Sequence, residues 1–399
     1  ALSQSNDHCG TKPAHAVIVI IFQRKITPFM SFRFAIVFAI AGLCSVVLLA
    51  CSSEDKSPSS TNCADVFLNE HETTLDQSTQ SLDQLQSATR LPNKRLVVTT
   101  ADPGVFLFEP DGTFVRQLGA AGQGPFEYQN PKVVRPYGSD IALWDAGNMK
   151  VTVYDQEGNS VKEWTGFTWA VADFAIRDGM FYSYYGGTRA PYLRIWDLEA
   201  EEMIAELDDE ASVRRAALSQ LQGTGSLAFH DGSMYALNPA APSVQQFDVA
   251  DGDVARYPIN DAAFTMGTLE ASSIGELNSM FAEVTEFGFS SSRSYKVFAA
   301  PSAILAVMQH GTITYDAPLF ENGRPNANAR MESYDRYLYV HQLTYEGEAT
   351  RCQRIDIDIE RAQNDHVILG PTPHGFLYRT IRETSGDVEY VLTEYALPE

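Results

Sequence analysis

The 399-residue chain is poor in positive charge and in lysine, and this restricts its partners. Only eight of its 29 basic residues are lysine, against 51 aspartates and glutamates, which gives a formal net charge of -22. Nucleic acids and anionic membrane surfaces bind clustered Lys and Arg that displace counterions, so neither is expected as the main partner. Charged residues make up only 20% of the chain and hydrophobic residues 44%, so the composition predicts a packed protein.

The sequence also lacks the local motifs of common catalytic sites. There is no Gly-x-Ser-x-Gly motif, since the stretch around Ser226 has the wrong spacing and opens a predicted strand. Residues 119–124 are rich in Gly but lack the strand-to-helix setting of a phosphate-binding loop, and we interpret them as a turn. The histidines from His71 onward show no H-x-H or H-x-x-x-H spacing, so no local zinc site is predicted.

The N-terminal region contains one apolar segment that resembles an export signal. Residues 34–50 are uncharged and apolar, follow Arg33, and precede Cys51 and a polar stretch. Residues 48–51 (LLAC) resemble the lipobox of a bacterial lipoprotein signal peptide, with Met30 upstream as a natural start. The resemblance implies that Cys51 becomes the mature N-terminus and carries acyl chains. The alternative is a single transmembrane anchor, because about 17–25 apolar residues can cross a bilayer.

These features predict four segments. Residues 1–29 are interpreted as a non-functional upstream extension, 30–50 as the lipoprotein signal peptide, 51–80 as a lipid-anchored polar tether and 81–399 as the folded domain. Ser rather than Asp follows Cys51, which by resemblance to bacterial sorting patterns implies an outer-membrane lipoprotein of the cell envelope, facing the periplasm or the cell surface. Without the first 50 residues, 25 basic residues remain against 50 acidic ones.

The same interpretation leaves two cysteines in the mature protein, Cys63 and Cys352. An envelope compartment permits disulfides, and one bridge would connect the tether to a late part of the fold. Two free thiols are the alternative.

Most of the remaining chain consists of short apolar runs separated by turn residues. From Leu96 onward, runs rich in Val, Ile, Phe, Tyr and Trp alternate with Asp-Gly and Glu-Gly steps, which favour hairpins because Gly accepts positive φ. Residues 96–119 and 141–166 share one pattern of strand, turn, strand, Gly turn and strand, and weaker copies follow. The spacing of roughly 40–50 residues is the period of a four-stranded β-propeller blade. We therefore predict an all-β fold.

Two parts of this prediction concern single segments. Between Ile259 and Met331 we expect one further blade, with residues 304–308 and 312–315 as a hairpin around His310 and Gly311, after a polar insertion with some helical character. Closure of a propeller usually needs a strand from one terminus to complete a blade begun at the other, which protects open sheet edges. We expect a strand within residues 83–91 to join the last blade, near residues 387–397.

The segment between the first two repeats has a distinctive composition, GAAGQGPFEYQNP, at residues 119–131. Followed by LWDAGNMKVTVYD, it resembles the linker of the six-bladed β-propeller lipoproteins of Bacteroidetes-type bacteria, which are similar to NHL-repeat and TolB-like propellers. The resemblance covers residues 96–164 and implies six blades of four antiparallel strands. Phe126 stands where the family pattern has Gly. The matching residues are Gly122, Gly124, Pro125, Glu127, Tyr128, Asn130 and Pro131. We interpret them as structural, because Gly and Pro shape the crossing between blades.

Two hypotheses of function follow. The first is a lipid-anchored, non-catalytic and monomeric propeller that binds an envelope protein, peptide or glycan through its upper face or axial channel. It needs no cofactor. The second is a metal-dependent hydrolase or lyase with a divalent cation on the propeller axis, as related scaffolds can host. Asp145, His310 and His341 are its candidate residues, although each is also explained as a turn or hydrogen-bonded strand residue, so no metal ligand is assigned.

Overall fold

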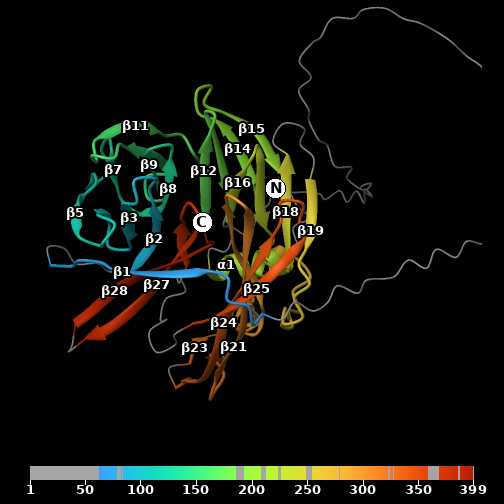
Figure 1. Ribbon diagram of the computed structural model, residues 1–399. Coiled ribbons are helices and arrows are strands. Elements are labelled where there is room, and N and C mark those ends of the chain that lie inside the picture. Colours follow the sequence, from blue (N-terminus) through green and yellow to red (C-terminus); the bar gives the residue numbers. More distant parts are fainter. Residues whose placement is uncertain are drawn as a thin grey trace, which may run out of the picture. The chain divides into compact units, whose positions relative to one another are not determined.

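The computed structural model describes residues 63–78, 82, 84–185, 193–207, 213–222, 226–248, 254–277, 279–321, 324–326, 328–357, 368–384 and 387–398. All of them lie in one compact unit, residues 56–399. This part of the chain forms six four-stranded antiparallel sheets, the blades of a β-propeller, which confirms the predicted fold (Figure 1). The predicted signal peptide and Cys51 lie outside the described residues.

The first three blades follow the repeats seen in the sequence, with the strands in chain order. Blade 1 consists of β2 (Leu85–Arg90), β3 (Leu96–Thr100), β4 (Gly104–Phe108) and β5 (Phe114–Gln117). Blade 2 consists of β8 (Pro131–Tyr137), β9 (Asp140–Asp145), β10 (Lys150–Tyr154) and β11 (Ser160–Trp164). Blade 3 consists of β12 (Asp173–Arg177), β13 (Met180–Tyr184), β14 (Leu193–Asp197) and β15 (Glu202–Leu207). Between blades 1 and 2, β6 (Ala120–Ala121) pairs with β7 (Glu127–Tyr128).

The later blades are less regular. Blade 4 consists of β16 (Leu227–His230), β17 (Ser233–Leu237), β18 (Ser243–Asp248) and β19 (Val254–Pro258). Blade 5 consists of β20 (Arg293–Ala300), β21 (Ala303–Tyr315), β24 (Met331–Leu343) and β25 (Ala349–Asp356). Blade 6 consists of β26 (Ile368–Pro371), β27 (Gly375–Thr384), β28 (Asp387–Ala396) and β1 (Asn69–Thr74). Additional elements are β22 (Phe320–Glu321), β23 (Arg324–Pro325), α1 (Val213–Gln222), α2 (Ile274–Leu277) and α3 (Phe281–Ser290).

The ring is closed by β1, not by the segment 83–91 that the sequence predicted. Every residue of β1 pairs with β28, and Figure 1 shows the blue β1 beside the red β28. Segment 83–91 instead contains β2, the innermost strand of blade 1. The burial patterns explain the assignment, because β2 is almost wholly buried whereas β1 exposes all its residues except Thr73, as an outer edge strand can. The blade sheet therefore starts within the predicted tether.

Blade 5 corrects a second expectation. Residues 304–308 and 312–315 do not form a hairpin, because β21 continues through His310 and Gly311 and pairs with β24 from Ile304 to Tyr315. Gly311 has a φ of +89°, and a Cβ there would lie 1.5 Å from the carbonyl oxygen of Asp335 on β24. The glycine thus permits a close approach of two strands rather than a turn. The expected helical character before this blade is confirmed by α2 and α3.

The core lies between adjacent blades. Blades 2 and 3, for example, share a buried cluster in which Trp144 packs against Phe167 and Phe181 with ring centroids 5.5 and 6.0 Å apart. Large aromatic side chains fill the wedge between neighbouring sheets. The innermost strand of each blade faces the axis, and these strands line the cavities described below. They are β2, β8, β12, β16, β20 and β26.

Candidate functional site

A wide cavity lies on the axis, at the end where the innermost strands finish. Its volume is about 460 Å³, and the innermost strand of every blade contributes to its wall. The wall is mainly apolar and aromatic, with Phe174, Phe229 and Phe298 among its residues. A cavity of this size, with few polar groups on a largely apolar wall, has the properties of a ligand site.

The charged groups of the wide cavity are arginines. The Arg177 guanidinium lies 5.4 Å from the centroid of the Phe229 ring, and Arg177 is exposed. Arg90 forms an ion pair of 2.7 Å with Glu394. Cation and aromatic ring together form a surface that can contact both apolar and hydrogen-bonding parts of a ligand.

Deeper along the axis, a buried ion pair and its hydrogen bonds link four blades. Arg135 on β8 approaches one oxygen of Asp173 on β12 through Nε at 2.7 Å and Nη2 at 2.6 Å. The other Asp173 oxygen accepts the N–H of Leu227 on β16 at 3.0 Å. Arg135 Nη1 also donates to the carbonyl of Val134 at 2.7 Å and to the hydroxyl of Ser87 on β2 at 3.3 Å. These contacts tie the innermost strands together at mid-channel.

Two narrower cavities continue toward the end where the innermost strands begin. The inner one, about 40 Å³, is lined by Arg135 and Lys296 among others, and the outer one, about 250 Å³, by Arg379. Lys132 and Gln86 line both cavities. Burial lowers the pKa of Lys296 to about 8, with a further lowering by the charges of Arg135 and Lys132 and an opposing effect of Asp173. Burial also lowers the pKa of Arg379.

Asp145 lies at the end of β9 and acts as a turn residue. Its contacts differ from those of the metal ligand that the second hypothesis allowed. Its carboxylate accepts the backbone N–H groups of Gln129 at 3.1 Å, Asn130 at 2.7 Å and Gly147 at 3.1 Å. These hydrogen bonds fix the entry into β8, and the carboxylate is fully buried. All its described contacts are structural.

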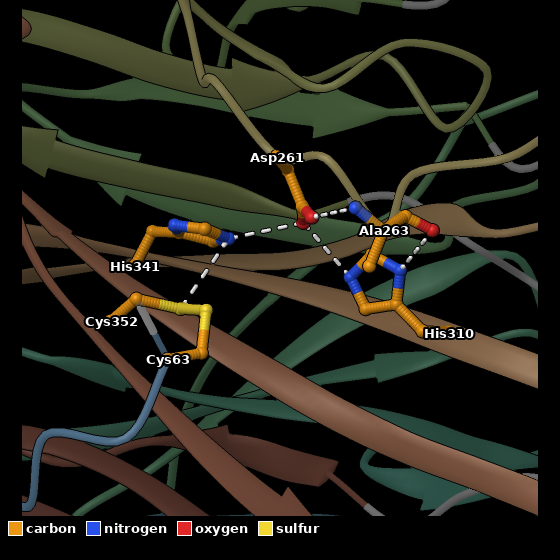
Figure 2. Close-up of a disulfide and its surroundings, with 6 residues drawn as sticks. All are labelled: Cys63, Asp261, Ala263, His310, His341 and Cys352. Atoms are coloured by element: carbon orange, nitrogen blue, oxygen red, sulfur yellow. Dashed lines mark hydrogen bonds and ion pairs between the residues drawn. A yellow bond between two sulfur atoms is a disulfide. The ribbon is translucent and has the colours of Figure 1, made fainter. Parts of the chain in front are cut away.

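The other two candidates, His310 on β21 and His341 on β24, lie together around a buried carboxylate that the sequence did not indicate (Figure 2). Oδ2 of Asp261, which follows β19, lies 2.9 Å from Nε2 of His310 and 3.1 Å from Nε2 of His341. His310 Nδ1 also lies 3.2 Å from the carbonyl oxygen of Ala263. Burial alone would raise the pKa of Asp261, but hydrogen bonds and charges from both histidines outweigh it and lower the pKa.

A disulfide between Cys63 and Cys352 borders this cluster (Figure 2). The Cys352 sulfur lies 3.8 Å from Nε2 of His341. The two sulfurs and this imidazole are close enough to share a metal ion, but sulfurs joined in a disulfide are not thiolate ligands. Since the Asp261 and histidine side chains are at most 2% exposed, the cluster joins the segment after blade 4 to blade 5 rather than facing a ligand.

The linker residues singled out in the sequence lie in the crossing between blades 1 and 2. The Glu127 carboxylate accepts the N–H of Gly124 at 2.7 Å, and the Tyr128 hydroxyl accepts a hydrogen bond from Gln117 at 2.8 Å. Pro131 begins β8, while Asn130 lines the outer narrow cavity. The remaining linker residues are Gly122, which donates its N–H to the Tyr128 carbonyl at 2.8 Å, and Pro125, which is exposed.

Phe126 has a backbone conformation that glycine favours. Its φ is +59°, in the left-handed region, which costs a non-glycine residue roughly 1–2 kcal/mol. Its N–H donates to Glu163 at 2.7 Å, and its carbonyl accepts the Tyr154 hydroxyl at 3.1 Å. Contacts with blade 2 therefore hold the turn despite the side chain.

Comparisons with known proteins agree with this fold. Residues 54–203 match a family model described as a 6-bladed beta-propeller, DUF5128. A solved structure of a Bacteroides fragilis protein described as exported is 12% identical, with a TM-score of 0.55 over 84% of this chain and 98% of its own. A DUF4221 member from Bacteroides vulgatus is 9% identical, with a TM-score of 0.53 and the same coverage. These likenesses show the fold alone. No curated protein matches the chain.

Within the described ranges, no helix is both long enough and apolar enough to cross a bilayer. Residues 34–50, for which the sequence suggested a signal peptide or an anchor, fall outside those ranges.

Proposed function

We propose that the chain is a lipid-anchored propeller of the cell envelope that binds a protein, peptide or glycan without transforming it. The observation that carries this proposal is the wide axial cavity, to which the innermost strand of each blade contributes. A site built from six blades is rigid, because most wall residues lie on strands that are held by their own sheets. Such a rigid cavity reduces the ordering that binding would otherwise cost.

The composition of the cavity favours a chain segment that inserts into it. Aromatic rings such as Phe229 can stack on a sugar ring or an apolar side chain, while the planar guanidinium of Arg177 can hydrogen-bond to a carboxylate or hydroxyl beside it. A volume of about 460 Å³ accommodates a few residues of a peptide or glycan. The rest of the ligand would remain outside.

The location rests on different observations. Cys51 ends a lipobox-like segment, and a structural neighbour from Bacteroides is described as exported. Acylation of Cys51 would attach the chain to the outer membrane, facing the periplasm or the cell surface, by burying the acyl chains. The propeller would act there as a monomer.

The alternative, a metal-dependent hydrolase or lyase, requires carboxylate, His or Asn side chains that converge on the axis. Of these types, the described linings of the three axial cavities contain Asn130 alone. His310, His341 and Asp261 are bound to one another in a buried cluster instead. No observation favours this alternative, and we develop the binding function.

Binding can be tested with peptide and glycan arrays probed with the labelled full-length chain. We expect Phe229→Ala and Arg177→Ala to abolish the signals that the wild type gives. The matched control is Arg354→Ala, which removes a similar cation–ring contact, 4.1 Å from the Tyr337 ring, outside the described linings of the axial cavities. Equal loss of signal in the control, or full binding by both cavity variants, would contradict the proposal.

A further inference from the structure

Three side chains beside the buried Asp261 carboxylate combine the donor atoms of a metal site. The sulfurs of Cys63 and Cys352 and a ring nitrogen of His341 all lie within 4.8 Å of one another. The two sulfurs form a disulfide in the structure, and in that state they are not thiolate ligands. Both cysteines enter the protein as thiols during synthesis, so a reduced chain precedes the oxidised one. In the reduced chain each sulfur can become a thiolate, which is a strong zinc ligand.

Two of the donors are held side by side by the sheet itself. His341 on β24 lies directly opposite Cys352 on β25 in the antiparallel ladder of blade 5. Directly paired residues of such a ladder have their Cβ atoms about 4.5–5.5 Å apart. The Cys352 sulfur accordingly lies 3.8 Å from Nε2 of His341. Backbone hydrogen bonds of the sheet fix this pair, so opening of the disulfide leaves it in place.

The third donor is held by contacts of its neighbours in the chain. Ala64, next to Cys63, forms an antiparallel β-bridge with Gln353 on β25. The side-chain oxygen of Gln353 also accepts the N–H groups of Phe67 and Leu68, both at 3.0 Å. Phe67 and Leu68 are buried in a core cluster formed by blades 5 and 6. The segment before β1 therefore keeps Cys63 beside β25 without the S–S bond.

The spacing of these donors suits a zinc ion. Zinc binds thiolates at about 2.3 Å and imidazoles at about 2.0–2.1 Å in a tetrahedral arrangement, which places a sulfur and a nitrogen ligand about 3.5 Å apart. The observed 3.8 Å between Cys352 and His341 is close to this value. A carboxylate oxygen of Asp261 lies 3.1 Å from the same imidazole nitrogen, and His310 contacts that oxygen at 2.9 Å. Carboxylates beside the ligands are typical of the surroundings of a metal ion.

From this geometry we propose that the reduced chain binds one Zn²⁺ ion through the sulfurs of Cys63 and Cys352 and Nε2 of His341. Two thiolates and an imidazole favour zinc over Mg²⁺ and Ca²⁺, which take oxygen ligands. Cys63 is half-buried while the other two ligands are buried, so the ion enters from the side of Cys63. The bound ion replaces the disulfide as the link between the segment before β1 and blade 5. The site is independent of the ligand proposed for the wide cavity.

Metal binding and the disulfide exclude each other, because both use the same two sulfurs. Binding of Zn²⁺ displaces one proton from each thiol and transfers no electrons. Formation of the disulfide removes the two protons and two electrons, and the electrons pass to a disulfide donor that is itself reduced to a dithiol. A disulfide donor that oxidises the zinc-bound thiolates therefore releases the ion.

The test uses the full-length chain with Cys9, Cys44 and Cys51 replaced by Ser, so that only the two cysteines of the site remain. The protein is reduced with a phosphine and titrated with Co²⁺, whose charge-transfer absorption reports thiolate ligands, and Zn²⁺ is then added to displace the cobalt. We expect saturable 1:1 binding of Co²⁺ by the reduced chain and none by the oxidised chain. Excess Mg²⁺ should leave the absorption unchanged.

Variants identify the ligands. His341→Gln should weaken binding roughly tenfold or more, because one of three ligands is lost. His71→Gln is the matched control, since His71 is an exposed histidine on β1 and should leave the affinity unchanged. If His341→Gln does not fold, Cys63→Ser removes a ligand at a half-buried position and should weaken binding and the charge-transfer absorption.

A thermal measurement separates a site in the folded protein from binding by an unfolded chain. Zn²⁺ should raise the thermal midpoint of the reduced chain, because it binds the folded state, and should leave that of the oxidised chain unchanged. Any of four results would overturn the proposal: no saturable Co²⁺ binding by the reduced chain, equal binding by the oxidised chain, undiminished affinity in folded His341→Gln, or a reduced chain that no longer folds.

Discussion

Replacing Asp261 by Asn should destabilise the propeller by about 3 kcal/mol, without touching any axial cavity. The carboxylate is 2% exposed and contacts two imidazoles that are 0% and 1% exposed, at 2.9 and 3.1 Å. Loss of one partner from a buried ionic group costs about 3–5 kcal/mol, and Asn recovers part of this because its amide oxygen can still accept a hydrogen bond. Urea unfolding followed by tryptophan fluorescence measures the difference.

The matched control for this prediction is Asp231→Asn. Asp231 also faces a histidine, with an oxygen 3.2 Å from Nε2 of His230, but its side chain is 90% exposed. Its backbone has a φ of +45°, which Asn tolerates, so the expected change lies within about 0.5 kcal/mol. If Asp261→Asn and Asp231→Asn unfold at the same urea concentration, the cluster does not stabilise the fold and our reasoning about it is wrong.

The same pair of variants predicts a pH dependence. The folded-state pKa of Asp261 lies below its unfolded value of about 3.9, so its ionisation stabilises the fold above that value. This stabilisation disappears as the pH falls from about 4 through the folded-state pKa. The free-energy gap between wild type and Asp261→Asn should therefore be largest above pH 5 and should shrink below pH 4. A gap that grew on acidification would contradict this sign.

Three further predictions concern closure, the disulfide and the anchor. Leu75→Ala should lower the free energy of unfolding by about 2–4 kcal/mol, since Leu75 directly follows β1 and is 2% exposed, whereas Val66→Ala, at 84% exposure, should be neutral in the same urea titration. Replacing both disulfide cysteines by alanine should cost about 2–4 kcal/mol, because the bridge spans 289 residues, and dithiothreitol should then have no further effect on the thermal midpoint. Cys51→Ser should abolish incorporation of labelled palmitate in a bacterial host, whereas Cys44→Ser should not; equal labelling of both variants would exclude Cys51 as the acylated residue.

The repeated blades were predictable because their signal is local. Each hairpin of blades 1 and 2 carries its own turn residues, and the apolar runs between them follow the period of one blade. The closing strand was not predictable in this way. The sequence of β1, NEHETT, is polar, as expected of a tether. An edge strand needs to bury only one side chain, here that of Thr73. Its partner β28 lies more than 300 residues away, so no local pattern links the two.

Blade 5 illustrates a second limit. A glycine between two apolar runs usually marks a turn. Gly311 instead allows β21 and β24 to approach closely, and this contact cannot be read locally because β24 begins 20 residues later. The candidate site shows the same limit. His310 and His341 could be named as candidates, whereas Asp261 could not, because it reaches them only after blade 4 is packed against blade 5. The cations at the narrow end of the axis also depend on three different blades.

The central claim, that the wide axial cavity is the binding site, is tested most directly by site-specific photocrosslinking in intact cells. Phe229 in the cavity and Phe281 on α3, which is 61% exposed, would each be replaced by p-benzoylphenylalanine in otherwise identical full-length chains. The proposal predicts one dominant adduct from position 229, lost when Arg177→Ala is added, and none from position 281. Equal adducts from both positions, or an adduct from position 281 alone, would contradict it.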